Sequence, residues 1–161
     1  MPQDILYKEA EYVFSYRVGG ILIRNGKILL QKPLNDDYAI IGGHVSGMET
    51  SVQALQREFF EEIHANIHIH RLLAVGELFF PWGNRTCHQI CLYYLVDLED
   101  AAAFPLEGSF LGFDECDNLR TDLEYRWIPL EQLSQLTIYP PEVISHILSG
   151  DTDVLHFVYK E

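Results

Sequence analysis

The sequence predicts an α/β fold in which a mixed β-sheet carries helices on both faces. Three observations support this: several runs rich in β-branched and aromatic residues, one long amphipathic helical pattern in mid-chain, and a shorter one near the end. Strands on either side of a central helix favour such a layered arrangement. The 161 residues are enough for one domain with a sizeable core, so we expect a single domain over residues 1–161.

Strands are expected over 13–24, 27–31, 38–41, 67–80, 86–98, 125–128 and 154–159, and helices over 50–63, 129–133 and 141–149. Each expected strand is an apolar run bounded by turn-forming residues. Asn25-Gly26 predicts a hairpin between the first two strands, because both residues tolerate positive φ. Gly19-Gly20 indicates a bulge in the first strand, and Pro81 to Asn84 predicts the turn between the fourth and fifth strands.

The central helix has the clearest periodicity. Val52, Leu55, Phe59 and Ile63 recur at steps of three or four residues, so they form one apolar stripe. The last helix is delimited by proline in its first turn and by Gly150 after its end. Both helices therefore have a face that can pack on a sheet.

Residues 99–121 show no regular pattern and contain Pro105, Gly108 and Gly112. We expect a long irregular loop there. A loop of this length in a compact domain is more often functional or mobile than idle.

The net negative charge of the chain argues against nucleic acid as a binding partner. The chain has 11 Lys and Arg against 24 Asp and Glu, a formal net charge of −13. Nucleic-acid binding requires basic groups that neutralise phosphates, so we expect no general nucleic-acid binding. The sequence also lacks an apolar run long enough for a membrane span and the pattern of a signal peptide. We therefore expect a soluble, cytoplasmic protein without membrane association. The acidic charge does not exclude a small phosphorylated ligand, because divalent cations can screen its phosphates.

The segment Arg57 to Glu62, with the sequence REFFEE, carries the most chemical information. Glu58, Glu61 and Glu62 are three and four residues apart, so on a helix they share a face, which we expect to lie opposite the apolar stripe. Crowded carboxylates are suitable oxygen ligands for Mg²⁺, and the planar guanidinium of Arg57 can fix the orientation of one of them. For this segment alone, a solvated acidic helix face is the simpler interpretation.

The residues before the helix favour the metal site. Gly42-Gly43 allows a ligand to approach the backbone closely and offers an unobstructed carbonyl. Glu49 lies near the helix start, where an acidic residue is also favoured simply by the helix dipole.

These residues together resemble the Nudix box, G-x5-E-x7-R-E-U-x-E-E-x-G-U. Gly43 is followed after five residues by Glu49 and after seven more by Arg57-Glu58, and every charged position of the box is filled. His64 replaces the second glycine of the box, which we interpret as a local cost in stability, because His tolerates a left-handed turn less well. Outside the box, Trp127 to Leu130 is similar to the W-x-P-L segment of many members, and Ile41 replaces a frequent proline.

The resemblance implies a Nudix-type α/β/α sandwich that hydrolyses a nucleoside diphosphate linked to another moiety, with Mg²⁺ or Mn²⁺ as cofactor. By position in the box, Glu58, Glu61 and Glu62 would bind the metal, together with the Gly42 carbonyl. Arg57 would orient a glutamate, Glu49 would brace the loop, and Gly43 would face the substrate. His44, just after the glycines, could contact a phosphate of the substrate, although a partly exposed histidine without a role explains it equally well. The resemblance leaves open whether the chain forms a homodimer.

The catalytic base is left open, because members of the family take it from the box or from a later loop. Glu61 is the candidate within the box, and Glu107, Glu115 and Glu124 are the candidates outside it. For each of these three, taken alone, a solvated surface acid is the simpler interpretation.

The substrate is also left open. Pro81 lies at about the distance after the box at which members acting on ADP-ribose carry a proline, although a turn proline explains it equally well. ADP-ribose or a similar nucleotide sugar is therefore a first guess, with a nucleoside triphosphate as the other option. A Nudix-fold sensor that binds a nucleotide without cleaving it is the alternative function.

Overall fold

The computed structural model describes residues 2–34, 36–116 and 119–161, except for the side chains of residue 103 and of residues within 113–122. Its strands are β1 (Leu6–Lys8), β2 (Tyr12–Arg24), β3 (Lys27–Lys32), β4 (Tyr38–Ala39), β5 (Ile41–His44), β6 (Ile67–Trp82), β7 (Arg85–Leu98), β8 (Ser109–Cys116), β9 (Leu119–Pro129), β10 (Ile138–Tyr139) and β11 (Leu155–Lys160). Its helices are α1 (Ser51–Ile63), α2 (Pro141–Ser149) and two 3-10 turns, η1 (Ala101–Ala103) and η2 (Leu130–Gln135).

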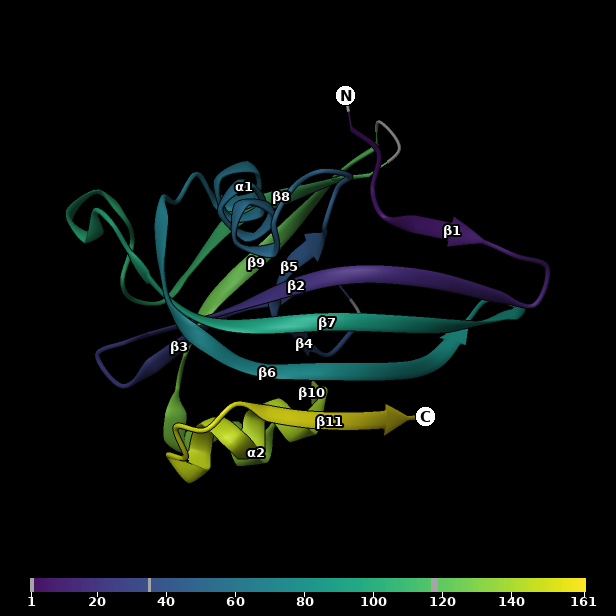
Figure 1. The fold of residues 1–161 in the computed structure, drawn as a ribbon. Coiled ribbons are helices and arrows are strands. Elements are labelled where there is room, and N and C mark those ends of the chain that lie inside the picture. Colours follow the sequence, from purple (N-terminus) through teal and green to yellow (C-terminus); the bar gives the residue numbers. More distant parts are fainter. Residues whose placement is uncertain (1, 35, 117–118) are drawn as a thin grey trace.

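The strands form a mixed sheet in the order β10-β4-β3-β2-β7-β6-β11. The pairs β2/β7, β6/β11 and β4/β10 are parallel, whereas β6/β7 and β2/β3 are antiparallel. Helix α1 lies on one face of the sheet and α2 on the other (Figure 1). The predicted mixed sheet with helices on both faces is therefore confirmed. Among the helices that the structure describes, none is long and apolar enough to cross a membrane.

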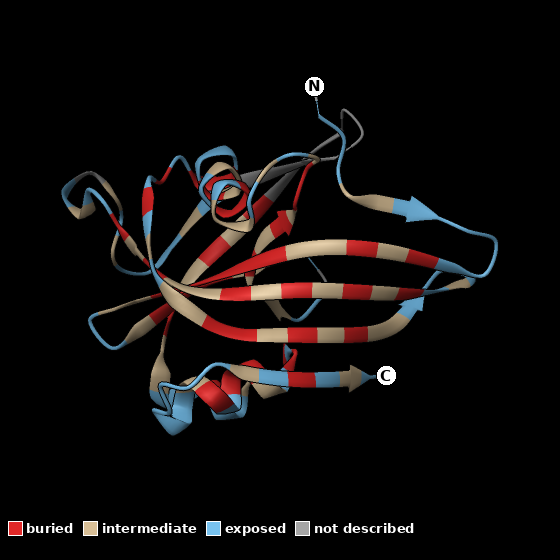
Figure 2. Ribbon diagram, viewed as in Figure 1, coloured by how far each residue is buried: buried red, intermediate tan, exposed pale blue. Residues whose placement is uncertain are grey.

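Each face of the sheet has its own apolar core (Figure 2). On one face, the fully buried Leu55 and Phe59 of α1 pack against strand residues that include Leu22. On the other, Val143 and Ile144 of α2 pack against the side chains of Ile21 and its neighbours. Adjacent residues of β2 thus enter opposite cores, as the alternation of a strand requires.

The glycines of the long strands have a different role from the one that the sequence predicts. The register of β2 with β7 runs without interruption from Tyr12 to Leu22, so the predicted bulge at Gly19-Gly20 is wrong. A Cβ at Gly20 would lie 2.5 Å from the ring of Phe59. This glycine therefore allows α1 to approach the sheet closely.

The predicted irregular loop over 99–121 is also wrong in part, because β8 and the start of β9 occupy much of it. Gly112, which indicated a break, lies inside β8, where a Cβ would be 2.5 Å from the carbonyl oxygen of Glu62. Pro81, expected in a turn, is a strand residue paired with Thr86 at the end of the β6/β7 hairpin.

Helix α1 begins and ends as local chemistry requires. Thr50 caps its start: the hydroxyl accepts from the Gln53 backbone N–H (3.1 Å), and the Gln53 side chain accepts from the Thr50 N–H (2.9 Å). At the other end His64 adopts a left-handed conformation, with φ 54° and ψ 30°. This is the conformation that the glycine of the box would adopt without steric cost.

Replacing His64 by glycine tests that interpretation. We expect His64→Gly to change the free energy of unfolding by between zero and a gain of about 1 kcal/mol, because relief of the left-handed strain is offset by the greater freedom of glycine in the unfolded chain. His64→Ala is the matched control: it also removes the ring but keeps the strained Cβ, so it should be less stable than the glycine variant. Denaturant unfolding measures both, and a tenfold loss of turnover in His64→Gly would reveal a direct role for the imidazole.

Candidate active site

The glycine pair lies inside a strand rather than at the end of one. Gly42 and Gly43 belong to β5, which pairs with β2 through Gly42↔Gly19 and Gly43↔Val18. A Cβ at Gly42 would lie 2.0 Å from the Val18 carbonyl oxygen, so no larger residue fits between the two backbones. A Cβ at Gly43 would lie 2.3 Å from the carboxyl carbon of Glu58. The Glu58 carboxylate of α1 therefore packs directly against the backbone of β5.

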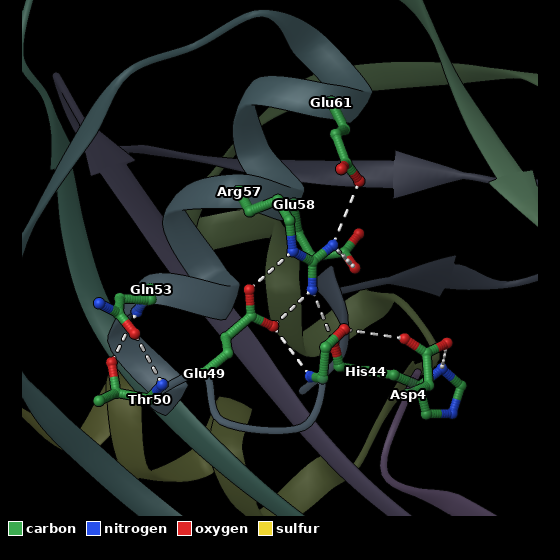
Figure 3. A network of polar contacts seen from close by, with 9 residues as sticks. Asp4, His44, Glu49, Thr50, Gln53, Arg57, Glu58 and Glu61 are labelled. Carbon is green, nitrogen blue, oxygen red and sulfur yellow. Dashed lines mark hydrogen bonds and ion pairs between the residues drawn. The ribbon is translucent and has the colours of Figure 1, made fainter. Parts of the chain in front are cut away.

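Arg57 connects the loop before α1 to the acidic helix (Figure 3). Its Nε and Nη2 atoms donate to the two carboxylate oxygens of Glu49 (2.9 and 2.8 Å), and Nη2 also donates to the carbonyl of His44 (3.0 Å). Its Nη1 atom donates to Glu58 (3.0 Å) and Glu61 (3.2 Å). One guanidinium thus holds the loop, the end of β5 and two of the three box glutamates.

The electrostatic consequences are opposite for Glu49 and Glu58. The hydrogen bonds from Arg57 hold the pKa of Glu49 below its usual value. Burial raises the pKa of Glu58 from 4.5 to about 7, and the contact with Arg57 offsets only part of this effect. A buried carboxylate that resists ionisation in the metal-free protein gains most from a nearby cation.

Glu62 is buried in the structure, contrary to the expectation of a face turned away from the core. The residue is only 3% exposed. Its Oε1 atom accepts from the Tyr125 hydroxyl (3.0 Å) and from the Gln31 amide (3.0 Å). The carboxylate of Glu62 therefore points into the space between α1 and strands β3 and β9.

The other predicted residues lie around this core of the site. Glu61 is the outermost box glutamate, with 56% of its side chain exposed. His44 ends β5, and its Nδ1 atom lies 3.7 Å from the carboxylate of Asp4. Ser46 donates its N–H to Glu49 (2.9 Å), so Glu49 contacts both the loop and Arg57.

The candidate bases outside the box are placed differently. Glu124 belongs to β9 and accepts two hydrogen bonds from Arg126 (2.8 and 2.9 Å), which lower its pKa. It is adjacent to Tyr125 in the strand, so it projects from the face opposite the Glu62 contact. Glu107 is exposed in the segment before β8, and the side chain of Glu115 lies outside the part that the structure describes.

The donor set is suitable for a hard divalent cation, because carboxylate and carbonyl oxygens are its preferred ligands. In the structure, however, Glu58 and Glu61 contact Arg57, whereas Glu62 contacts strand residues. Within the described residues, no three His, Cys, Asp or Glu side chains are gathered closely enough to hold a metal ion. The chemistry of the residues thus fits a divalent cation, while their side chains make contacts within the protein.

A cavity of about 150 Å³ opens on the sheet face that carries α2. Its lining residues come from β2, β4, β5, β7 and β10 and the link between β4 and β5, and they are Arg17, Val18, Gly19, Ala39, Ile40, Gly42, Gln89, Cys91, Tyr93 and Tyr139. Gly42 thus contributes to this cavity, while its neighbour Gly43 faces Glu58. The cavity and the Glu58 carboxylate therefore lie on opposite sides of β5 at the glycine pair.

Sequence reasoning missed the residues that complete the site. Gln31 and Tyr125, which hold Glu62, lie 31 and 63 positions from it, and no local pattern connects them. Arg17 lines the cavity from the middle of β2. The alternation of polar and apolar residues in β2 places Arg17 on a face but does not reveal the cavity.

Comparisons with known proteins agree with this geometry. The family model of the NUDIX domain matches residues 14–146. No curated protein sequence matches the chain. The match of the family model to most of the chain shows that the protein belongs to the Nudix hydrolase family. Members of this family cleave diphosphate bonds with the help of a divalent metal ion.

Solved structures share the fold at low identity. A MutT Nudix hydrolase from Burkholderia pseudomallei is 23% identical, with 83% of this chain and 98% of that one covered and a TM-score of 0.58. An ADP-ribose pyrophosphatase from Streptococcus suis is 12% identical, with 91% and 98% covered and a TM-score of 0.57. A UDP-X diphosphatase is 15% identical, with 92% and 68% covered and a TM-score of 0.57.

The raised pKa of Glu58 predicts how the stability of the metal-free protein depends on pH. Below pH 4.5 the carboxyl is protonated in both the folded and unfolded chains, whereas above about pH 7 it must be ionised inside the protein. The folded state binds the proton more tightly, so this contribution to stability is lost as the pH rises from 4.5 to 7. We expect Glu58→Gln, which cannot ionise, to show a smaller fall in Tm than the parent between pH 5 and 8 in EDTA. Identical pH profiles for the two proteins would contradict the buried position of Glu58.

Proposed function

We propose that this Nudix hydrolase cleaves the diphosphate linkage of a nucleoside diphosphate joined to another moiety, with Mg²⁺ or Mn²⁺ as cofactor. The observation that carries the proposal is that two carboxylates of one helix, the largely covered Glu58 and the buried Glu62, lie close to the backbone of β5 and to strands β3 and β9, respectively. Ionised carboxylates that are shielded from water lower the stability of a metal-free protein, and a bound cation would offset this cost. The adjoining cavity would hold the nucleoside end of the substrate.

The residues would act in distinct ways. Glu58, Glu61 and Glu62, with the Gly42 carbonyl, would hold the metal, which when bound supplies positive charge and an activated water. Arg57 would keep Glu58 and Glu61 oriented, and Glu49 would brace Arg57 through its two hydrogen bonds. Gly43 and the end of β5 at His44 would form the surface along which the diphosphate lies.

Glu61 is our preferred base within the box, because it is the most exposed of the three glutamates and reaches solvent. Glu124 is less suited, since the two hydrogen bonds from Arg126 lower its pKa and so weaken it as a proton acceptor. Glu107 keeps the exposure that a mobile base would need.

ADP-ribose or a similar nucleotide sugar remains our first guess for the substrate. One structural neighbour is an ADP-ribose pyrophosphatase, although others are a UDP-X diphosphatase and a MutT hydrolase. The cavity of about 150 Å³ is small relative to sites of roughly 300 Å³ or more that enclose whole ligands, so it would hold only one end of the substrate.

The test is a turnover screen of nucleotide sugars, dinucleoside polyphosphates and nucleoside triphosphates, each with Mg²⁺ and with Mn²⁺. We expect metal-dependent release of a nucleoside monophosphate or of inorganic phosphate products from one class. Tight binding of one ligand without turnover on any class would instead support the non-hydrolytic sensor, although the complete set of box carboxylates favours the enzyme.

A further inference from the structure

Arg17 places a cation in the cavity beside the glycine pair, where its charge offsets part of the rise that burial causes in the pKa of Glu58 but no described residue hydrogen-bonds to it. It is the only charged residue among the described residues that line this cavity. Its side chain is half-buried, and it makes no hydrogen bond or ion pair with any residue that the structure describes. Arg24, Arg57 and Arg126, by contrast, each pair with a carboxylate.

An unpaired, partly desolvated guanidinium is unfavourable unless an anion reaches it. The chain has a formal net charge of −13, so carboxylates are abundant on its surface. None of them meets Arg17 at hydrogen-bonding distance in the described part of the chain. The arrangement therefore leaves the planar fork of Arg17 available for a ligand, and such a fork matches a phosphate group bidentately.

The position of Arg17 relates the cavity to the proposed diphosphate site. In the β2/β5 pair, Arg17 is opposite His44 and Gly19 is opposite Gly42. Along β2, Arg17 is thus one residue from the position opposite Gly43 and two residues, or roughly 7 Å, from the position opposite Gly42, the other member of the glycine pair. On the far side of that pair, the Glu58 carboxylate rests against Gly43.

The rest of the lining is neutral. Burial raises the pKa of the Cys91 thiol to about 11 and raises the pKa of Tyr93 as well, so both groups are protonated near neutral pH. The Gln89 side-chain oxygen accepts from the Ser15 hydroxyl (3.4 Å), so its amide group still has N–H donors to offer. A ligand in this cavity therefore meets one cation, hydrogen-bond donors and apolar surface.

We propose that Arg17 binds the phosphate group on the nucleoside side of the scissile bond, and so positions the nucleotide whose nucleoside occupies the cavity. The inference rests on the proposed function, and it assigns the two halves of the diphosphate to different cations. The carboxylate helix would serve one phosphate through its metal, whereas Arg17 would serve the other directly.

The test measures binding without metal. In EDTA, calorimetry compares AMP, GMP, CMP and UMP with the corresponding nucleosides, using the full chain. We expect the best-bound monophosphate to bind on the order of 10-fold to 100-fold more tightly than its nucleoside, because a hydrogen bond to a charged group contributes that much. Arg17→Met should remove this difference and leave the affinity for the nucleoside unchanged, while Arg17→Lys should restore part of it.

Arg24→Met is the matched control, because Arg24 lies on the same strand and pairs with Asp97 at the surface (3.2 Å). It should keep the full preference for the monophosphate. In steady-state kinetics, Arg17→Met should raise KM more than it lowers kcat, as expected for loss of a contact that holds the substrate before and during the reaction.

Three results would overturn the proposal: no preference of the parent protein for the monophosphate, an unchanged preference in Arg17→Met, or an equal loss for monophosphate and nucleoside in that variant. The last would indicate that Arg17 only shapes the cavity. If Arg17→Met fails to fold, the comparison in the parent protein and Arg17→Lys still decides. If the parent protein turns over a substrate but binds the monophosphate no more tightly than the nucleoside, only the role of Arg17 is rejected. If no substrate in the screen is turned over, the proposed reaction itself is rejected.

Discussion

Glu62→Gln is expected to lower kcat by at least 10² to 10³ while the protein stays folded, because removal of a group that stabilises developing charge typically costs about that much. Glutamine has nearly the shape of glutamate and can still accept from Tyr125 and Gln31, which both donate to Oε1 (3.0 Å each). The substitution therefore removes charge with little change in packing. Steady-state kinetics on the substrate found in the screen, with calorimetric metal titration, measure the effect.

Tyr125→Phe is the matched control for Glu62→Gln. It removes one hydrogen bond to the carboxylate but keeps the ring, which stacks on Phe110 at 5.7 Å, and the negative charge. We expect a much smaller loss of kcat than in Glu62→Gln. Normal turnover by Glu62→Gln would mean that the carboxylate helix is not the active site, and the central proposal would fail.

The candidate bases can be separated in the same assay. If Glu107→Gln, Glu115→Gln and Glu124→Gln all keep full activity, the base lies within the box and Glu61 is the choice. If the kcat of one of these variants falls as far as that of Glu62→Gln, the residue replaced in that variant is the base.

Much of the fold could be predicted because its signals are local. The hairpin at Asn25-Gly26 and the central helix follow from positive φ and from a repeating apolar stripe, and both residues of the hairpin turn do have positive φ. Two of the errors share a cause, because Gly19, Gly20 and Gly112 indicate a break when they are considered from the sequence alone. In the structure they lie inside strands where another element approaches closely, and sequence cannot distinguish a glycine needed for space from one needed for conformation.

The candidate site was predictable only along the helix. The spacing of Glu58, Glu61 and Glu62 placed them near one another, because helical geometry is fixed by residue number. The burial of Glu62 was not predictable, since residues of β3 and β9 cover it and strand pairing depends on contacts distant in sequence. For the same reason the cavity that contains Arg17, assembled from several strands, left no signal in the sequence.

Gly43→Ala is expected to lower kcat on the order of 10² while Tm changes little. The new Cβ would lie 2.3 Å from the carboxyl carbon of Glu58 and 2.4 Å from its Oε1 atom, so the carboxylate must move. The displaced atoms are the end of a flexible side chain, so the fold can accommodate the methyl group. The metal site cannot accommodate the methyl group without loss of activity, because a shift of about 1 Å in a catalytic group lowers the rate on the order of 10²-fold.

Gly47→Ala is the matched control, because the nearest atom to its new Cβ would be the Gln3 carbonyl oxygen at an ordinary 3.8 Å. Gly47 lies in the turn that follows β5, and this variant should keep normal activity. The double variant Gly43→Ala/Glu58→Gln shows whether Gly43→Ala lowers kcat by displacing Glu58 or by obstructing the substrate. If Gly43→Ala acts by displacing Glu58, the double variant will be no slower than Glu58→Gln alone, since residues that act through one contact are not additive. A further loss in the double variant would show instead that the methyl group obstructs the substrate directly.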